Sequence, residues 1–253
     1  MIDTHAHIYS AEFDNDQKDM IFRSKEAEVS CILMPAIDAL THDKMLRTEK
    51  DFPGFCYSMM GVHPCSISEN YKKELKIAED FFSKRKFVAV GETGLDFYWD
   101  VTFKKEQYDA FNQQIEWALQ YDVPVVIHSR NSTDECIETV AVHQQGKLKG
   151  VFHCFSGNAE QAKKIIDLGF YLGIGGVVTF KNSGLDKVIK EIGLSHVVLE
   201  TDAPYLAPVP FRGKRNECSY LKYVAEKLAM VAELDAKEVE RITTSNAEKL
   251  FSL

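Results

Sequence analysis

FVAVGE (residues 87–92) is a short apolar run, and FKKEQYDAFNQQIEWALQY (residues 103–121) is the long amphipathic stretch that follows it. The run is rich in valine and nearly continuous in hydrophobicity, which is typical of a strand buried on both faces. The stretch has the pattern of an amphipathic helix. Eight such apolar runs occur along the chain, at residues 1–6, 29–36, 55–62, 87–92, 124–129, 150–155, 170–176 and 196–202.

Each apolar run is followed by an amphipathic stretch, and the last has an additional helical neighbour at 236–251. Eight strand–helix units in 253 residues predict an α/β fold, a (β/α)8 TIM barrel that forms a single domain over 1–253. An open doubly wound sheet is the alternative, and it is weakened because no glycine-rich phosphate fingerprint follows the first run. Gly169 and Gly193 are expected to end helices, and Asp235 with Glu238 is expected to form a capping box.

The composition predicts a cytoplasmic protein with an ample core, because 45% of the residues are hydrophobic. No apolar run reaches the ~18 residues needed to span a bilayer, and the first residues lack a signal-peptide pattern. The six cysteines are scattered, so we expect reduced thiols, with Cys31 in the core. A net charge of −8 argues against a broad coat of nucleic acid. It leaves room for a local basic site, because surface fields decay over ~8 to 10 Å at physiological salt.

Polar residues follow the predicted strands at their carboxyl ends. His5 and His7 lie two positions apart in the first run, and side chains alternate along a strand, so both point to the same face. In a barrel of this kind the carboxyl ends of the strands meet at one rim, where chemistry is expected. The residues at these ends are His5, His7, His63, Glu92, His128, His153 and Asp202.

These seven groups predict a divalent-metal site. A buried carboxylate is costly without a partner, and no basic residue ends any of these strands. A cation is therefore the natural compensating charge for Glu92 and Asp202. Imidazole with carboxylate suits zinc, manganese and similar ions, whereas magnesium prefers more oxygen. Seven groups exceed the demand of one tetrahedral ion, which favours two ions whose identity (magnesium, manganese or zinc) stays open.

Seven short motifs are spread over essentially the whole chain: DTHAH (3–7), GVHP (61–64), GETGLDFYWD (91–100), HSR (128–130), HCFSG (153–157), LETDAPYLAP (199–208) and RGKRNE (212–217). In this order and spacing they resemble the TatD family of metal-dependent deoxyribonucleases, within the amidohydrolase-like barrels. The resemblance implies a (β/α)8 barrel whose site can hold two divalent ions. It also implies cleavage of DNA from the 3′ end, with a preference for single strands.

The same resemblance implies a role for each residue at the strand ends. One ion would be held by His5, His7, Glu92 and Asp202. The other ion would be held by Glu92, His128 and His153, so that Glu92 bridges the two. His63 would lie beside the metals and contact phosphate. The predicted catalytic residues are Asp202, Glu92 and His63, and the position of Asp202 at the last strand end suits a base that accepts a proton from water.

The loop after Asp202 carries three basic residues that we expect to bind phosphate, namely Arg212, Lys214 and Arg215. Three prolines stiffen this loop, and a solvated turn is the alternative interpretation. The family usually places a proline where Cys218 stands, so the loop is expected to be looser without loss of activity. Aromatic residues at 97–99 could stack on bases or pack the loop against the barrel, and both interpretations stay open.

Two other functions are compatible with parts of this pattern. A metal-dependent amide or ester hydrolase, acting on a small molecule or an aminoacyl ester of RNA, would use the same metals. It is disfavoured by RGKRNE, because a small neutral amide does not need those charges. A non-catalytic binding barrel would be expected to have lost ligands, and none is missing. We expect single-stranded DNA or strand ends as the partner, no membrane or obligate protein partner, and a monomer.

Overall fold

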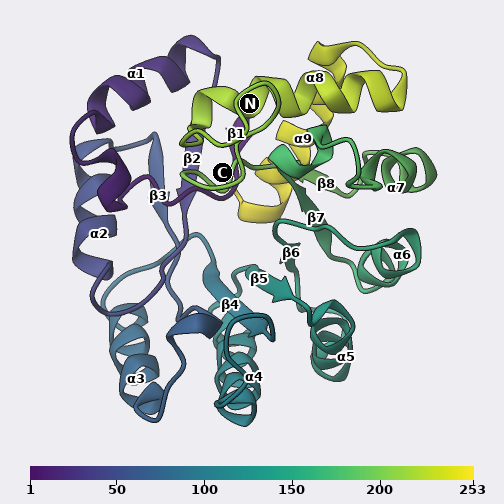
Figure 1. Cartoon of the computed structure of the whole chain (residues 1–253). Coiled ribbons are helices and arrows are strands. Elements are labelled where there is room, and N and C mark those ends of the chain that lie inside the picture. The colour runs from purple at the N-terminus through teal and green to yellow at the C-terminus, as the bar shows by residue number, and fades with distance from the viewer.

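The structure, a computed structural model, describes residues 1–253 and places the strands at the centre with helices around them (Figure 1). The strands are β1 (Ile2–Asp3), β2 (Cys31–Met34), β3 (Cys56–Ser58), β4 (Val90–Asp96), β5 (Val125–Arg130), β6 (Gly150–Phe152), β7 (Tyr171–Ile174) and β8 (Val197–Leu199). The helices are α1 (Gln17–Glu26), α2 (His42–Asp51), α3 (Tyr71–Phe82), α4 (Lys104–Tyr121), α5 (Thr133–His143), α6 (Ala159–Asp167), α7 (Leu185–Ile192), α8 (Leu221–Ala232) and α9 (Ala236–Phe251). None of the helices combines the length and apolar character that crossing a bilayer requires.

The strands pair in chain order within two parallel sheets, β1-β2-β3 and β4-β5-β6-β7-β8. Single parallel bridges join the sheets at both junctions, Met60 with Val90 and Ala6 with Ala203. This sequential order lacks the reversal of a doubly wound sheet, so that alternative is wrong. The predicted eight parallel strands are confirmed. The prediction was one continuous barrel, whereas the strands form two hydrogen-bonded sheets. The reason is that β1 has only two residues and β3 only three, so that one bridge joins the sheets at each junction.

Alternate strand residues pack in two different apolar clusters. In β2, Ile32 and Met34 belong to a large cluster that includes the helices, whereas Cys31 and Leu33 belong to a smaller one. Every strand, or a residue next to it, contributes to the smaller cluster, and α9 completes it with Ala247, Leu250 and Phe251. The small cluster therefore forms an interior core among the strands, on which α9 packs beside β1 and β8.

Several local predictions can be compared with the structure. Gly169 and Gly193 follow their helices with left-handed φ of 81° and 70°, as expected. All six cysteines are free, and Cys31 is buried in the core. The capping box is wrong: the Asp235 carboxylate caps α9 by accepting the Lys237 N–H, but the Glu238 carboxylate pairs with Arg241 and does not return to the cap.

Candidate metal centre

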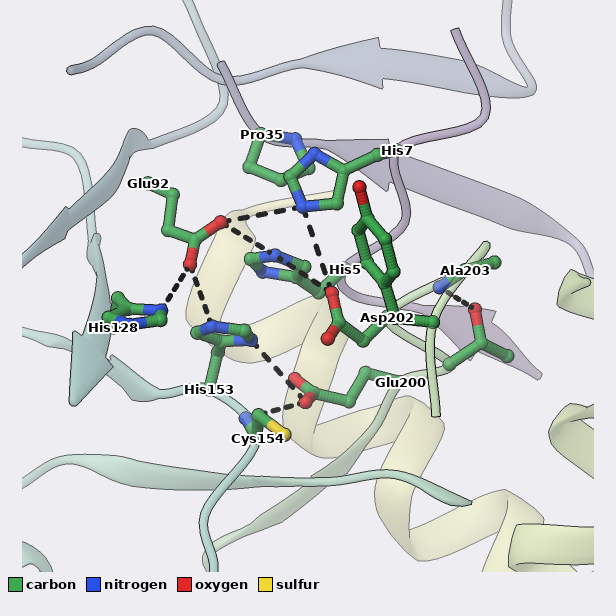
Figure 2. Close-up of polar contacts among 12 residues, drawn as sticks. His5, His7, Pro35, Glu92, His128, His153, Cys154, Glu200, Asp202 and Ala203 are labelled. Carbon is green, nitrogen blue, oxygen red and sulfur yellow. Dashed lines mark hydrogen bonds and ion pairs between the residues drawn. The ribbon is translucent and has the colours of Figure 1, made fainter. Parts of the chain in front are cut away.

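Six of the seven predicted residues line one cavity of about 730 Å³, and the seventh, His5, is fully buried with its Nε2 3.1 Å from Glu92 Oε2. Glu92 and His128 belong to β4 and β5, and the others follow β1, β3, β6 and β8. In Figure 2 the carboxylate of Glu92 faces the rings of His7, His128 and His153, which come from different strand ends. Gly94 permits this approach of β4 to β5, because a Cβ there would lie 2.1 Å from the His128 carbonyl oxygen.

One oxygen of Glu92 faces the histidines of the β1 end. Glu92 Oε2 is 3.1 Å from His5 Nε2 and 3.5 Å from His7 Nε2. Asp202 completes this group, with its Oδ1 3.8 Å from His5 Nε2 and 3.7 Å from His7 Nε2. The Asp202 N–H also donates to the His5 carbonyl oxygen at 2.9 Å, which ties the two chain segments together. The first predicted ligand set is thus brought together as expected.

The other oxygen of Glu92 faces three further histidines. Glu92 Oε1 is 2.8 Å from His128 Nδ1, 2.8 Å from His153 Nε2 and 3.2 Å from His63 Nε2. The structure therefore separates the two carboxylate oxygens between two groups of imidazoles. Such a division is what a carboxylate that bridges two cations requires.

His63 differs from the other histidines in the atom it presents. Its Nδ1 accepts the backbone N–H of Cys65 at 3.0 Å. Because that amide can only donate, Nδ1 carries no proton and the ring proton lies on Nε2, which faces the cavity. His63 thus offers a hydrogen-bond donor to the cavity, as a contact to phosphate needs, and not a lone pair for a metal.

Burial and charge explain the pKa shifts of the two carboxylates. Burial alone would raise the pKa of Glu92, but His153, His63 and His5 outweigh it and hold that pKa well below its usual range. Burial raises the pKa of Asp202 to about 6, against the opposing effect of His153 and His7. Glu92 is therefore an anion within a dense ring of imidazoles.

The donor set fits divalent cations. Imidazole nitrogens and carboxylate oxygens lie within 4.8 Å of one another in three groups, which share members: His5, His153 and Asp202; His5, His7 and Glu92; and His63, Glu92 and His128. In the last group His63 presents its N–H, so Glu92 and His128 supply the lone pairs. Imidazole and carboxylate are donors that zinc and manganese accept. No lysine or arginine contacts Glu92 or Asp202 in place of a metal.

Comparison with known proteins decides the family. The family model described as "TatD related DNase" matches residues 2–252. The chain belongs to the TatD family. The resemblance inferred from the motifs is thereby confirmed over almost the whole chain.

Individual TatD-family relatives match the chain end to end. It is 37% identical to an uncharacterized metal-dependent hydrolase, YabD, of Bacillus subtilis, over all of this chain and 99% of that protein. It is 30% identical to the 3'-5' ssDNA/RNA exonuclease TatD of Erwinia tasmaniensis, over the full length of both. The crystal structure of YjjV, a TatD homologue from Escherichia coli, superposes with a TM-score of 0.94 at 30% identity, covering all of this chain and 98% of that one. This TatD-family chain is therefore a metal-dependent hydrolase.

Two buried carboxylates behind the histidines were not predicted from the sequence. Asp96 Oδ2 is 2.8 Å from His128 Nε2. Glu200 Oε1 accepts the Cys154 N–H at 2.6 Å and lies 3.6 Å from His153 Nδ1 (Figure 2). Both residues stand inside motifs of this TatD-family chain, Asp96 in GETGLDFYWD and Glu200 in LETDAPYLAP. Their position at or near the ends of β4 and β8 was the signal that could have identified them.

The three basic residues predicted to bind phosphate from the loop after Asp202 do not line the cavity of this TatD-family structure. Arg215 instead donates two hydrogen bonds of 2.7 Å to the Asp16 carboxylate, and this bonding lowers the pKa of Asp16 to about 2. Arg212 packs over the Phe180 ring, 4.1 Å from its centroid. The physical reason is local pairing: carboxylate and aromatic partners near the loop hold these side chains away from the metal groups. Lys214 likewise does not line the cavity.

Arg130 is the one arginine or lysine that lines the cavity, and no role was predicted for it from the sequence. Its guanidinium lies 3.9 Å from the Tyr98 ring centroid and 5.1 Å from that of Trp99. Tyr98 and Trp99 are 53% and 68% exposed, whereas Phe97 packs against the core. Packing against the barrel is confirmed for Phe97, whereas base stacking stays a prediction for Tyr98 and Trp99.

Replacing Glu92 tests the centre directly. Glu92→Gln keeps the shape of the side chain but removes the anion that both groups of histidines face, so we expect manganese affinity to fall by at least about 10-fold. Isothermal titration of metal-stripped protein with Mn²⁺ measures this affinity. His143→Asn, on α5 and bonded to Asn112, is the matched control and should bind manganese like the parent. Unchanged binding by E92Q would contradict the assignment.

Proposed function

We propose that this TatD-family hydrolase is a divalent-metal-dependent phosphodiesterase that removes nucleotides from the 3′ end of single-stranded DNA. The observation that carries the proposal is the division of the two Glu92 oxygens between two groups of imidazoles. Two adjacent metals suit phosphodiester hydrolysis, because both the attacking and the leaving oxygen need charge stabilisation. The relative from Erwinia tasmaniensis is named a 3'-5' ssDNA/RNA exonuclease, which supports the same substrate class here.

The protein's own residues define where two ions would bind. One ion would be held by His5, His7, Glu92 and Asp202. The second would be held by Glu92, His128 and His153. When bound, such ions neutralise phosphate and lower the pKa of water. Magnesium, manganese and zinc all stay candidates, because this donor set does not select strongly among them.

Two side chains at the cavity have roles that their geometry supports. Asp202 is 14% exposed at the side chain and lines the cavity, where its carboxylate can accept a proton from the attacking water. His63 carries its ring proton on Nε2 and can donate it in a hydrogen bond to a phosphate oxygen. Asp202 is thus the proposed general base, and His63 is the proposed hydrogen-bond donor to phosphate.

The rim of the cavity suits the end of a single DNA strand whose terminal base is unstacked. Trp99 and Arg130 line one part of it, and Tyr205 and Leu206, 48% and 41% exposed, also line it. Aromatic and guanidinium planes stack on any base, and the guanidinium also attracts phosphate. A small neutral amide would need neither feature, so an amide or ester hydrolase is the weaker alternative. Arg212 and Lys214 are exposed and follow Leu206 closely in the sequence, so they stay candidates for contact with the rest of the DNA strand.

The proposal treats the two sheets as one closed (β/α)8 barrel. Backbone hydrogen bonds cross both junctions: Thr4 N–H donates to the Leu199 carbonyl oxygen at 3.0 Å, and Gly91 N–H to that of Met60 at 3.0 Å. Closure brings the carboxyl ends of all eight strands to one rim, as the site requires. A cytoplasmic location and a monomeric state stay predictions.

The base assignment predicts a large loss of activity on Asp202→Asn. The amide cannot accept the proton, so we expect turnover of 5′-labelled single-stranded DNA with Mn²⁺ to fall by about 10²- to 10⁴-fold. The parent should shorten the DNA from its 3′ end, and chelator should stop it. Circular dichroism and Mn²⁺ titration of the variant control for folding and metal content. Parent-like turnover by D202N would remove Asp202 as the base. A parent that hydrolyses esters but leaves DNA intact would support the alternative function.

The rim predicts a selective effect of Trp99→Ala on substrate binding. Loss of a stacking surface costs about 1–3 kcal/mol per base, so KM for single-stranded DNA should rise by about 5- to 150-fold while kcat changes little. Steady-state kinetics with a short oligonucleotide measure both constants. Phe22→Ala, which removes a 63% exposed aromatic residue from α1, is the matched control and should leave KM unchanged. An unchanged KM in W99A would show that bases do not stack there.

A further inference from the structure

Asp96 closes strand β4 with a carboxylate that is 2% exposed and bonded on both oxygens. Its Oδ2 lies 2.8 Å from His128 Nε2, and the other ring nitrogen, Nδ1, lies 2.8 Å from Glu92 Oε1. The imidazole of His128 is therefore held between two carboxylates. One faces the cavity and the other lies behind the ring.

The second oxygen of Asp96 fixes the segment that carries the aromatic rim. Asp96 Oδ1 accepts the backbone N–H of Tyr98 at 2.9 Å and that of Trp99 at 3.3 Å. The backbone of Asp96 is itself fixed by buried Gln107 of α4, which accepts its N–H at 2.9 Å and donates to its carbonyl oxygen at 3.2 Å. The Asp96 carboxylate thus contacts both His128 and the turn that presents Trp99. The hydrogen bonds to Gln107 hold the Asp96 backbone in place.

We propose that Asp96 is a positioning residue that fixes the tautomer of His128 and, through the same carboxylate, the placement of Trp99 at the rim of the cavity. A neutral imidazole has one N–H, and a carboxylate can only accept. Both ring nitrogens of His128 face carboxylates, so a cation at Nδ1 is needed to distinguish them: it would take the lone pair on Nδ1, and the one remaining proton would lie on Nε2, where Asp96 accepts it. Carboxylates that accept from the outer nitrogen of a metal-ligating histidine fix its tautomer and orientation in this way.

The tautomer can be read directly in the Zn²⁺-loaded protein, without substrate. Nitrogen-15 chemical shifts of His128, assigned by comparison with His128→Asn, should show the Nε2–H form. Asp96→Asn turns an amide toward the ring and should shift the population toward Nδ1–H, because the amide donates where the carboxylate accepted. A parent protein with the proton on Nδ1 would overturn the proposal even if a variant failed to fold.

Two substitutions separate the two parts of the proposal. D96N keeps an oxygen that can accept from Tyr98 and Trp99, so it should weaken Mn²⁺ binding by about 10- to 100-fold and leave the Trp99 segment in place. D96A removes both oxygens, so it should weaken Mn²⁺ binding and also make Trp99 more mobile. Mobility is measured by time-resolved fluorescence anisotropy in a Trp117→Phe background, since the chain has two tryptophans.

Asp100→Asn is the matched control in the same loop. Its carboxylate accepts only the Thr102 N–H, at 2.8 Å, and does not contact His128. It removes the same charge and should leave both Mn²⁺ affinity and Trp99 anisotropy at parent values. Parent-like Mn²⁺ affinity in D96N, or unchanged Trp99 anisotropy in D96A, would overturn the proposal.

The inference rests on the proposed function only for the presence of metal at His128. The tautomer and binding measurements involve no DNA, so the two can fail separately. A protein that shows the expected tautomer and D96N effect but leaves DNA intact would support the inference and contradict the nuclease proposal. A parent protein that cleaves DNA, together with parent-like metal binding in D96N, would support the nuclease proposal and contradict the inference.

Discussion

The carboxylate of Glu92, buried among five imidazoles, is the interaction on which the arrangement of the site depends. A carboxylate that is 2% exposed needs a compensating positive charge. Its neighbours here are histidines, which carry a positive charge only when protonated. Its two oxygens face different histidines, so compensation by cations can occur on both sides. Histidines from strand ends far apart in the sequence thus meet around this one carboxylate.

A second layer of polar groups supports this arrangement. Asp96 holds His128 from behind, and Glu200 lies behind His153 in a space that Gly173 leaves open, since a Cβ there would lie 2.2 Å from Glu200 Oε2. These carboxylates are buried and act on ring nitrogens that face away from the cavity. The precision of the centre therefore depends on residues that would not themselves contact a cation.

The sequence predicted the elements, and the residues that meet at the centre, more completely than the surroundings of the site. Strand ends follow from apolar runs, and a shared rim follows from parallel pairing, so His5, Glu92 and Asp202 could be placed together. The fate of Arg215 could not be predicted, because its partner Asp16 lies almost 200 residues away in the chain. The strand-end position of Asp96 could have placed it near the site, but whether a carboxylate lies behind a ring or in front of it depends on three-dimensional geometry.

Anomalous X-ray scattering from crystals of the parent protein soaked with Mn²⁺ tests the central claim most directly. The account predicts two manganese peaks about 3.5 to 4 Å apart, one beside each carboxylate oxygen of Glu92. The first should adjoin His5 and His7, and the second His128 and His153. A single peak, or peaks that do not contact Glu92, would contradict the account.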